Sequence, residues 1–548
     1  MRPILAEISD EFLAQLKEDL VCRRVGRGLG SLEEHRYLLT SFDPSVRNAA
    51  LFAGYLAQWV DIGFARPTLV KDLIAKFSKV ARAWLPVQGY LHLRMAEGMV
   101  AMAEESKDIA LKHFDFVLSL SEETDDKELL SIANFWKGRC LRMKGEYDQA
   151  LAFAAKGKEL ALELGHKPMA AVMQVLESWL FFQKGDVKQA IDILQMAEGV
   201  LGKTDDYLTL GNIYSSYGRI ARRQGRYQHA IESFTQAITL YKKRDPQHRN
   251  VARSLNNMAY VKRLIALQLR RKIDTEAARR RKAAKRGGTN EAQRKPQYRG
   301  RFEQLREEAL SELAEAAAIY KQYENHHGLG GVHLNYGYLY LDNGDLDHAE
   351  AAAKSAFRLG EERRDYILMA RARLLNSMME NARVEEGIGE STDPGSHARL
   401  AQDSAQEAIE LAKHTQNRRL LAYAYIWQGL TYCNRFFDDP DAARSCYDQA
   451  LSLSKADQAD SSWADLQTLK AKVLRAGTVN PMLRAWSQGA VGDKTFQQIN
   501  EEFAALVIPK VWEREGRKVS RVATRLSMSP KKVRRILRRA VRPKKAAE

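Results

Sequence analysis

The residues with the clearest potential for chemistry are four cations near the end of the chain. Lys531, Arg534, Arg535 and Arg538 are spaced i, i+3, i+4 and i+7, so a helix would place all of them on one face. Ammonium and guanidinium groups donate hydrogen bonds to phosphate oxygens, and such a stripe is about as wide as the major groove of duplex DNA. The spacing therefore predicts a helix face that binds a polyanion.

The basic character of the chain is concentrated in two segments. Residues 510–548 hold 15 Lys and Arg against 3 acids, and residues 270–301 hold 13 against 3. Together these excesses are larger than the net charge of +17 of the whole chain, so the remainder is slightly acidic. The basic character therefore belongs to these two local segments and not to the rest of the chain. For the middle segment the first interpretation is a solvated insertion without a partner. The second is weak auxiliary contact with a polyanion from Arg279, Arg280, Arg281, Lys282, Lys285 and Arg286. A nuclear-import signal has the same composition.

No arrangement of residues indicates catalysis, a metal site or a cofactor. The motifs of zinc proteases, phosphate-binding loops and serine hydrolases are missing, and the twelve histidines do not fall into a ligand spacing. Cys22, Cys140, Cys433 and Cys446 are far apart and form no CxxC pair, which argues against a zinc site and a disulfide framework. We therefore expect a protein that is not an enzyme.

The cationic stripe needs a small folded support, and the surrounding residues predict one. Residues 519–526 have a helical pattern, a turn is expected at 527–529, and Ser529 followed by Pro530 is a strong helix start. The second helix is expected to run to about Ala540. Apolar side chains at suitable spacing would hold the two helices together across the turn, namely Val522, Ala523, Leu526, Met528, Val533 and Ile536.

This stretch, roughly residues 496–540, resembles the Fis-type helix-turn-helix of bacterial transcription factors. The resemblance rests on Ala523, Leu526 and Met528, on the polar cap Ser529 and on the basic helix that follows. Ser527 stands where the family usually has Gly, and Pro509 is expected to interrupt the preceding helix. The resemblance implies that four cations face bases or phosphates, namely Lys531, Lys532, Arg534 and Arg535. It implies that four others contact the DNA backbone, namely Arg521, Arg525, Arg538 and Arg539. The helix cap Ser529 is also counted among the DNA-binding residues.

Most of the remaining chain is a repeat. An Ala is followed four residues later by an apolar or small residue and seven residues later by another, mostly in steps of 40 residues, so each triplet lies on one buried helix face. The triplets are Ala110, Phe114, Val117; Ala150, Ala154, Gly157; Ala190, Leu194, Ala197; Ala230, Phe234, Ala237; Ala309, Leu313, Ala316; Ala349, Ala353, Ala356; Ala401, Ala405, Ala408; and Ala443, Tyr447, Ala450.

Glycines mark the other parts of the repeating unit. A Gly precedes the Ala by twelve residues at Gly98, Gly138, Gly218 and Gly337, and another precedes it by five residues at Gly145, Gly185, Gly225 and Gly344. With sequences such as Gly145-Glu146-Tyr147, these units resemble the tetratricopeptide repeat over roughly residues 90–460, with a longer period of about 40. The resemblance implies an α-solenoid, a right-handed superhelix of helix hairpins, whose concave groove binds a protein or peptide.

The chain is therefore predicted to be all-α and to have three parts. An N-terminal helical cap covers 1–90, with Ser31 and Glu34 spaced as a capping box and Asp43-Pro44 as a helix start. The repeat array covers 91–475 and contains the basic insertion 270–301, expected as a loop that is helical in part, and a loop at 385–397. The helix-turn-helix domain with its basic tail covers 490–548. No apolar run is long enough for a membrane span, and the charged start of the chain indicates a cytoplasmic protein without membrane contact.

Two functions fit these features. The first is a DNA-binding transcriptional regulator, in which the repeat superhelix binds a protein or peptide and the C-terminal helix-turn-helix contacts duplex DNA. The alternative is a non-enzymatic scaffold or adaptor whose basic segments bind RNA or an acidic partner. Because Fis-type modules usually act in pairs, a homodimer is also expected.

Overall fold

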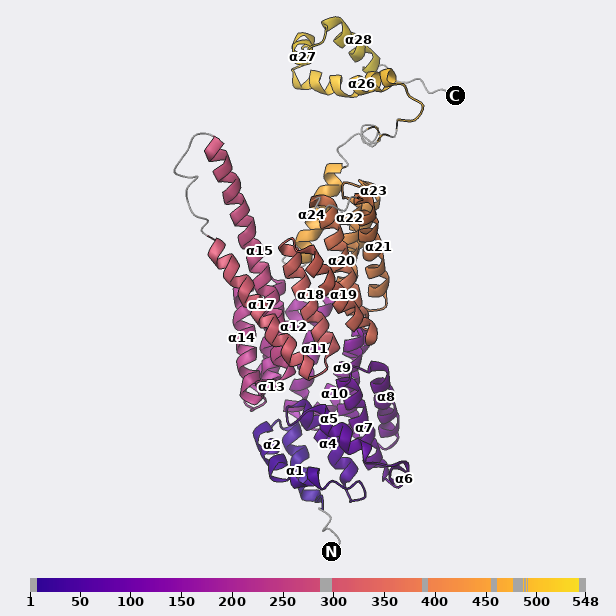
Figure 1. Ribbon diagram of the computed structural model, residues 1–548. Helices are drawn as coiled ribbons and strands as arrows, with labels where there is room; N and C mark the ends of the chain where they lie inside the picture. Colours follow the sequence, from indigo (N-terminus) through magenta and orange to yellow (C-terminus); the bar gives the residue numbers. More distant parts are fainter. Residues whose placement is uncertain are drawn as a thin grey trace, which may run out of the picture. The chain divides into compact units, whose positions relative to one another are not determined.

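The computed structural model describes residues 7–285, 298–386, 393–454, 461–476 and 491–541, together with Trp486 and Gly489. This described part of the chain is all-helical and contains no strand (Figure 1). It divides into two compact units, Met1–Lys470 and Ala471–Glu548, which we describe separately. The helix α24 (Ser461–Ala476) passes through the point of division.

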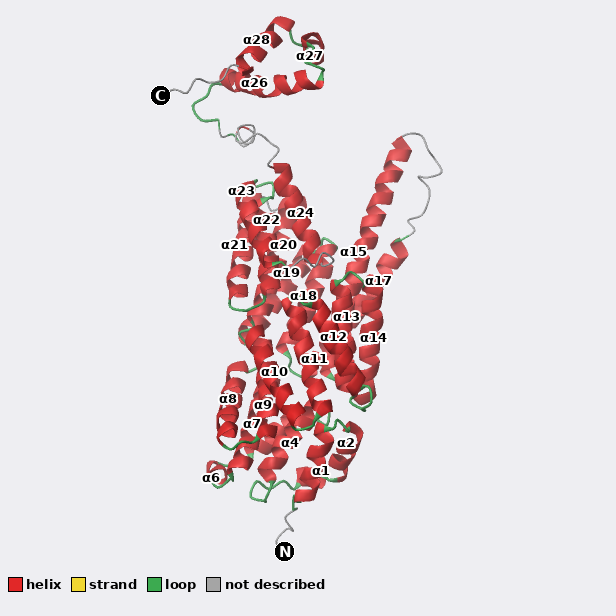
Figure 2. Cartoon of the chain, turned by 180° about the vertical axis from the view of Figure 1, so that it is seen from behind, coloured by secondary structure: helices red, strands yellow, loops and turns green. Residues whose placement is uncertain are grey.

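The larger unit contains eight helix hairpins among its described residues. A short turn joins each hairpin to the next (Figure 2). This confirms the tetratricopeptide-like α-solenoid expected from the sequence. The hairpins are α7 (Val87–Ala103) with α8 (Lys107–Glu123), α9 (Lys127–Lys144) with α10 (Tyr147–Glu163), α11 (Lys167–Lys184) with α12 (Val187–Leu201), α13 (Tyr207–Arg223) with α14 (Tyr227–Arg244), α15 (Arg249–Lys285) with α17 (Arg299–Gln322), α18 (His326–Asp342) with α19 (Leu346–Glu362), α20 (Tyr366–Glu386) with α21 (Pro394–Lys413), and α22 (Arg418–Tyr432) with α23 (Pro440–Leu453).

Short polar side chains start many of these helices. The carboxylate or amide oxygen of an Asp or Asn accepts a hydrogen bond from a backbone N–H two or three residues later, which satisfies one of the unpaired N–H groups of the first turn. Such caps stand at Asp126, Asp186, Asp206, Asn325, Asp345, Asp393, Asn417 and Asp439.

The alanine triplets lie where the repeat predicted them. Each lies on the second helix of a hairpin, and every member is buried except Tyr447, which is partly buried. The glycines twelve residues earlier lie on the first helix and face these triplets: a Cβ at Gly218 would lie 2.8 Å from the ring of Phe234, and a Cβ at Gly98 would lie 2.5 Å from the ring of Phe114. The small residues therefore allow the two helices of a hairpin to approach closely.

The second set of glycines forms the turns inside the hairpins. Gly145, Gly185, Gly225 and Gly344 have φ between 73° and 86°, a left-handed conformation that side chains with a Cβ rarely adopt. At Gly145 and Gly185 this residue is the C-cap of the first helix. The turns between the two helices of a hairpin are thus confirmed at these positions.

The first 90 residues are less separate than the sequence indicated. They form α1 (Asp10–Val21), α2 (Val25–Glu34), α3 (Tyr37–Thr40), α4 (Ala49–Asp61), α5 (Pro67–Ala75) and α6 (Lys79–Ala83). Their side chains share one hydrophobic cluster with the first hairpins, and the expected boundary at residue 90 lies inside α7. Two local predictions were wrong: Ser31 lies within α2, and Asp43-Pro44 lies in a turn between helices.

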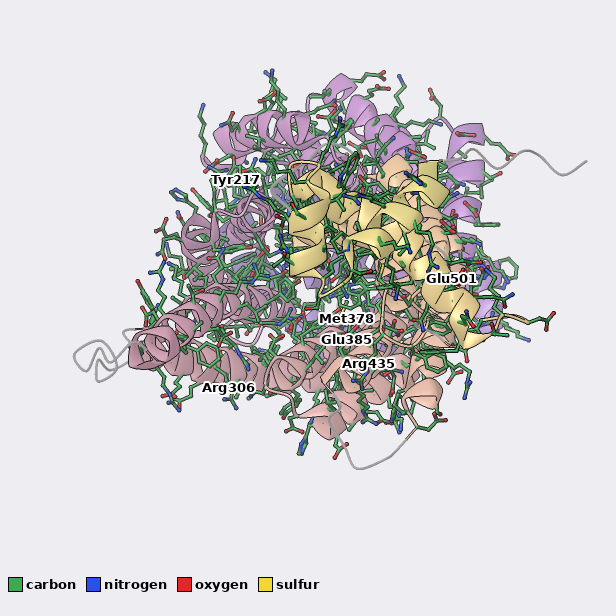
Figure 3. All side chains as sticks on the ribbon, turned by 90° about the horizontal axis from the view of Figure 1, so that it is seen from above. Tyr217, Arg306, Met378, Glu385, Arg435 and Glu501 are labelled. Atoms are coloured by element: carbon green, nitrogen blue, oxygen red, sulfur yellow. The ribbon has the colours of Figure 1, made fainter. Side chains whose placement is uncertain are left out.

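The basic insertion is more helical than expected. The helix α15 continues through Lys285, and its 37 residues extend for roughly 55 Å. Residues 286–297 lie outside the described part. Seen from above with the side chains drawn, α15 and α17 lie side by side at the edge of the larger unit, with Arg306 on α17 (Figure 3). The loop expected at 385–397 is shorter, because α20 ends at Glu386 and α21 begins at Pro394; residues 387–392 are outside the described part.

Turns that are distant in the sequence meet in the larger unit. The backbone N–H of Gln416 donates to the carbonyl oxygen of Gly145 at 2.9 Å, and the Gln416 side-chain oxygen accepts from the N–H of Asp148 at 2.8 Å. In a second place, Glu105 accepts a hydrogen bond of 2.7 Å from the side chain of Asn325. The array of hairpins therefore curves far enough for early and late hairpins to touch.

No helix in the described ranges combines the length and apolar character that a membrane crossing requires.

The glycine contacts predict opposite effects for two substitutions on helices. Gly218→Ala should lower the free energy of unfolding by about 1–3 kcal/mol, because the new methyl group overlaps the Phe234 ring. Gly199→Ala, on α12 with no neighbour within 4 Å of the added Cβ, should raise it by up to about 1 kcal/mol through helix propensity. Urea denaturation followed by circular dichroism measures both. Equal effects of the two substitutions would contradict the close approach of α13 and α14.

Candidate functional site

The smaller unit is built from three helices around an apolar centre. These are α26 (Phe496–Arg514), α27 (Val519–Arg525) and α28 (Pro530–Val541). The side chains of Ile508, Val522, Ala523 and Val533 are buried between them. The other apolar residues expected at the contact are partly buried in the same cluster: Leu526, Met528 and Ile536.

Local signals in this unit fix where the helices begin and end. Ser529 caps α28, since its side-chain oxygen accepts a hydrogen bond of 3.2 Å from the N–H of Lys532. Ser527 has a φ of 49°, the left-handed conformation in which the related motif usually has Gly. The expected interruption at Pro509 was wrong, because α26 continues through this residue to Arg514.

The cationic stripe of α28 is exposed. Lys531, Lys532, Arg534, Arg535 and Arg538 are all exposed, and no carboxylate of the described residues forms an ion pair with any of them. Because α28 is amphipathic, its apolar residues face the core while these cations face outward. The arrangement presents a dense positive surface on a folded support.

The other predicted cations of this unit differ in their surroundings. Arg521 on α27 is exposed, as is Arg525, but Arg525 forms an ion pair with Glu515. This pair reduces the charge that Arg525 can offer to a ligand. The side chain of Arg539 lies outside the described part.

The middle basic segment is only partly described. The exposed side chain of Arg279 projects from α15, and Arg280 lies 3.7 Å from Glu276 one turn earlier. The side chains of Arg281, Lys282 and Lys285 are outside the described part, as is the whole of Arg286.

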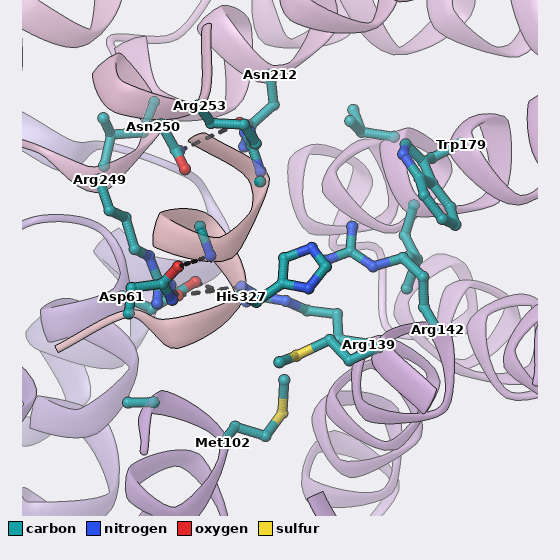
Figure 4. A pocket seen from close by; sticks show the side chains of 18 of the residues that line it. Asp61, Met102, Arg139, Arg142, Trp179, Asn212, Arg249, Asn250, Arg253 and His327 are labelled. Carbon is teal, nitrogen blue, oxygen red and sulfur yellow. Dashed lines mark hydrogen bonds and ion pairs between the residues drawn. The ribbon is translucent and has the colours of Figure 1, made fainter. Parts of the chain in front are cut away.

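A third place, which no sequence motif marked, is a cavity of about 970 Å³ inside the larger unit. Its lining comes from early and late hairpins together and includes many guanidinium groups. Arg139 and Arg249 reach toward Asp61, while Arg142 and Arg253 project into the same space (Figure 4). The sequence held one sign of this cavity. Arg139 and Arg219 directly follow Gly138 and Gly218, so the repeat places both arginines at equivalent positions of first helices.

One wall of the cavity is an ion-pair network around Asp61. Its carboxylate accepts hydrogen bonds of 2.7 and 3.2 Å from the guanidinium of Arg139 and one of 3.0 Å from that of Arg249. Burial alone would raise the pKa of Asp61, but Arg139 and Arg249 hold it well below the ordinary value. The network joins α4 to α9 and α15.

Three other arginines of the cavity have no carboxylate partner among the described residues. The guanidinium of Arg142 packs over Trp179 at 5.1 Å, that of Arg219 donates to Ser216 at 2.9 Å, and that of Arg253 donates to Asn212 at 2.6 Å. Burial lowers the pKa of Arg142 to about 9, and repulsion from Arg139 and Arg253 adds to the effect. The pKa of Arg219 is lowered to about 9 by burial and by Arg253. The cavity therefore holds positive charge that the protein itself does not neutralise.

The described residues contain no group of three or more His, Cys, Asp and Glu side chains that could hold a metal ion.

Comparison with known proteins supports the repeat and the fold. Residues 209–266 and 331–360 match models of the tetratricopeptide repeat, so the chain contains tetratricopeptide repeats at these positions. No curated protein sequence matches the chain. Neither repeat match reaches the C-terminal unit, and the Fis-type resemblance therefore stays a prediction.

Solved structures with similar folds have low sequence identity. A Rap protein complexed with Competence and Sporulation Factor is 12% identical with a TM-score of 0.50, and covers 74% of this chain and 100% of its own. The apo quorum sensor NprR from B. thuringiensis is 14% identical, with a TM-score of 0.44 and coverage of 72% and 97%. A human IFIT1 dimer with m7Gppp-AAAA is 12% identical, with a TM-score of 0.46 and coverage of 87% and 97%. At this identity the likeness to the Rap protein shows a shared fold alone.

The Asp61 network predicts a pH-dependent contribution to stability. Asp61→Asn should lower the free energy of unfolding at pH 7 by on the order of 2 kcal/mol, since it leaves two guanidinium groups without their carboxylate. The folded-state pKa of Asp61 is depressed, so this contribution is present above the unfolded pKa of about 4 and is lost as the pH falls below it. Urea denaturation at several pH values measures the difference.

The matched control is Asp115→Asn. The carboxylate of Asp115 is 2.6 Å from the ammonium of Lys137 but is 55% exposed, so its removal should cost less than about 1 kcal/mol. Equal losses for Asp61→Asn and Asp115→Asn would contradict the special role of the Asp61 network.

Proposed function

We propose that the protein is a DNA-binding transcriptional regulator of the cytoplasm, not an enzyme, whose C-terminal unit contacts duplex DNA and whose repeat unit binds a protein or peptide in its concave groove. The observation that carries this proposal is the exposed face of α28. Five cations lie there without ion-pair partners among the described residues, above a side that packs against α26 and α27.

The three helices support a helix-turn-helix of the Fis type. The turn at Ser527 to Ser529 follows α27 directly, and Ser529 begins the helix that carries Lys531, Arg534 and Arg535. A second helix of this kind enters the major groove with its N-terminal residues toward the bases. Arg521 and Arg538 would then contact the DNA backbone.

The alternative, a scaffold or adaptor that binds RNA or an acidic partner, draws on the extension of α15. Exposed arginines on this helix, such as Arg270, Arg271 and Arg279, lie in the other unit and are independent of α28. An adaptor should keep its partners when residues 490–548 are deleted, whereas a regulator should lose sequence-selective binding to duplex DNA.

The stripe predicts the result of a charge reversal. Arg534→Glu combined with Arg535→Glu should weaken binding of the full chain to duplex DNA by at least about tenfold at 100 mM salt, because two cations that contact phosphates or bases become anions. The dependence of the logarithm of affinity on the logarithm of salt should also become shallower, by about one for each phosphate that the variant no longer binds. Gel-shift or filter-binding titrations measure both quantities.

The control carries the same change in charge on another helix of the unit. Lys510→Glu with Arg514→Glu alters exposed residues of α26 and should leave most of the affinity in place. No duplex binding by the wild-type chain at low salt would contradict the proposal, and so would an equal loss in both double variants.

A homodimer is expected on DNA, because Fis-type modules usually act in pairs. Sedimentation velocity of the 62.2 kDa chain with and without a duplex should reveal two chains per complex, and a chain lacking 490–548 should not pair on DNA. A single chain both free and bound to the duplex would contradict the homodimer.

A further inference from the structure

The cavity of the larger unit has more positive charge than its own acids can neutralise. Four carboxylates of the described residues line it, and each already accepts a hydrogen bond or forms an ion pair. Asp61 pairs with Arg139 and Arg249, and Glu105 accepts from Asn325. The other two are Asp365, which pairs with His327 at 2.5 Å, and Asp245, which accepts from the N–H of Gln247 at 2.8 Å.

The uncompensated cations lie together on three first helices. Arg142 belongs to α9, Arg219 to α13 and Arg253 to α15, and the three are close enough for each of the first two to be affected by the charge of Arg253. A guanidinium group stays protonated under ordinary conditions, so its lowered pKa describes a charged group held in an unfavourable place. An anion bound between them would relieve this cost.

The rest of the lining indicates the kind of anion. Side-chain amides, each of which can both donate and accept hydrogen bonds as a peptide backbone does, line the same cavity at Asn212, Asn250, Asn256, Asn257 and Asn335. Side chains of Met102, Met169 and Leu176 give it apolar surface. Two of the aromatic rings in the lining, Trp136 and Trp179, pack against the guanidinium groups of Arg139 and Arg142 at 4.1 and 5.1 Å. The lining thus combines guanidinium groups, side-chain amides and apolar side chains, which suit the carboxylates, the backbone and the apolar side chains of a peptide.

We propose that the cavity binds a short peptide with apolar residues and carboxylates, and that Arg142, Arg219 and Arg253 hold the carboxylates. This inference rests on the proposed role of the concave groove as a partner-binding site and names the chemistry of the partner. The volume of about 970 Å³ lies in the range of cavities that enclose ligands of this size. Because the guanidinium groups come from three hairpins, a bound peptide would also bridge α9, α13 and α15.

Two peptide pools test the proposal on the full chain. The first is a pool of heptapeptides in which Asp or Glu alternates with Leu, Met, Val or Phe, with a free C-terminal carboxylate. The second is identical except that Asn and Gln replace the acids and the C-terminus is amidated. Native mass spectrometry should detect at least about ten times more bound peptide from the acidic pool. Equal binding of the pools, or none from the acidic pool, would overturn the proposal.

The variant Arg142→Gln with Arg219→Gln should lose at least about tenfold of this binding. The control, Arg358→Gln with Arg399→Gln, removes two cations that are 76% and 62% exposed on α19 and α21, and it should bind as the wild type does. Without peptide, the cavity variant should unfold at the same or a higher temperature than the wild type, since it removes charge repulsion. A lower unfolding temperature, or unchanged peptide binding, would overturn the assignment.

A 5′-triphosphorylated oligoribonucleotide serves as the contrasting probe. Its binding in place of acidic peptides, with loss in the cavity variant, would assign the cavity to RNA and overturn the peptide. Binding of duplex DNA to the same samples separates the two proposals. If the wild-type chain binds DNA but no acidic peptide, the peptide proposal alone is rejected. If it binds acidic peptide but no DNA, only the regulator is rejected.

Discussion

The close approach of the two helices in each hairpin is the constraint on which the rest of the larger unit depends. Gly98 and Gly218 have no side chain, so the rings of Phe114 and Phe234 pack directly against the backbone of the first helix. The alanines of the triplets are buried on the second helices all along the array. Regular spacing makes each hairpin rotate against the next by a similar amount, and the array curves until early and late turns touch, as Gly145 does with Gln416.

This curvature brings together charges that the sequence keeps far apart. Arg142, Arg219 and Arg253 come from different hairpins and share one cavity, where burial makes the charges of Arg142 and Arg219 costly. Asp61 compensates only the neighbouring pair, Arg139 and Arg249. In the smaller unit the opposite arrangement holds, because the cations of α28 are exposed and well hydrated. A hydrated stripe suits a large polyanion such as DNA, whereas buried guanidinium groups suit a small ligand that replaces lost water.

Much of the fold could be predicted from the sequence because small residues recur at fixed spacing. The alanine triplets, the marker glycines and the turn glycines lie where the repeat placed them. The helix start at Ser529 also followed from local chemistry. The helix starts predicted at Ser31 and Asp43 were wrong because capping patterns are short and occur by chance inside helices and turns. The interruption predicted at Pro509 was wrong because tertiary packing can hold a helix through a proline. The cavity was missed because its residues meet only through the winding of the superhelix.

The proposed regulator depends most on whether the C-terminal unit selects DNA sequences in the cell. Genome-wide capture of the DNA bound to the full chain and to a chain lacking residues 490–548 measures this directly. The account predicts that the full chain enriches a defined set of sites with a shared sequence, and that the truncated chain enriches none of them. The same sites captured by both chains, or no enrichment by the full chain, would contradict it.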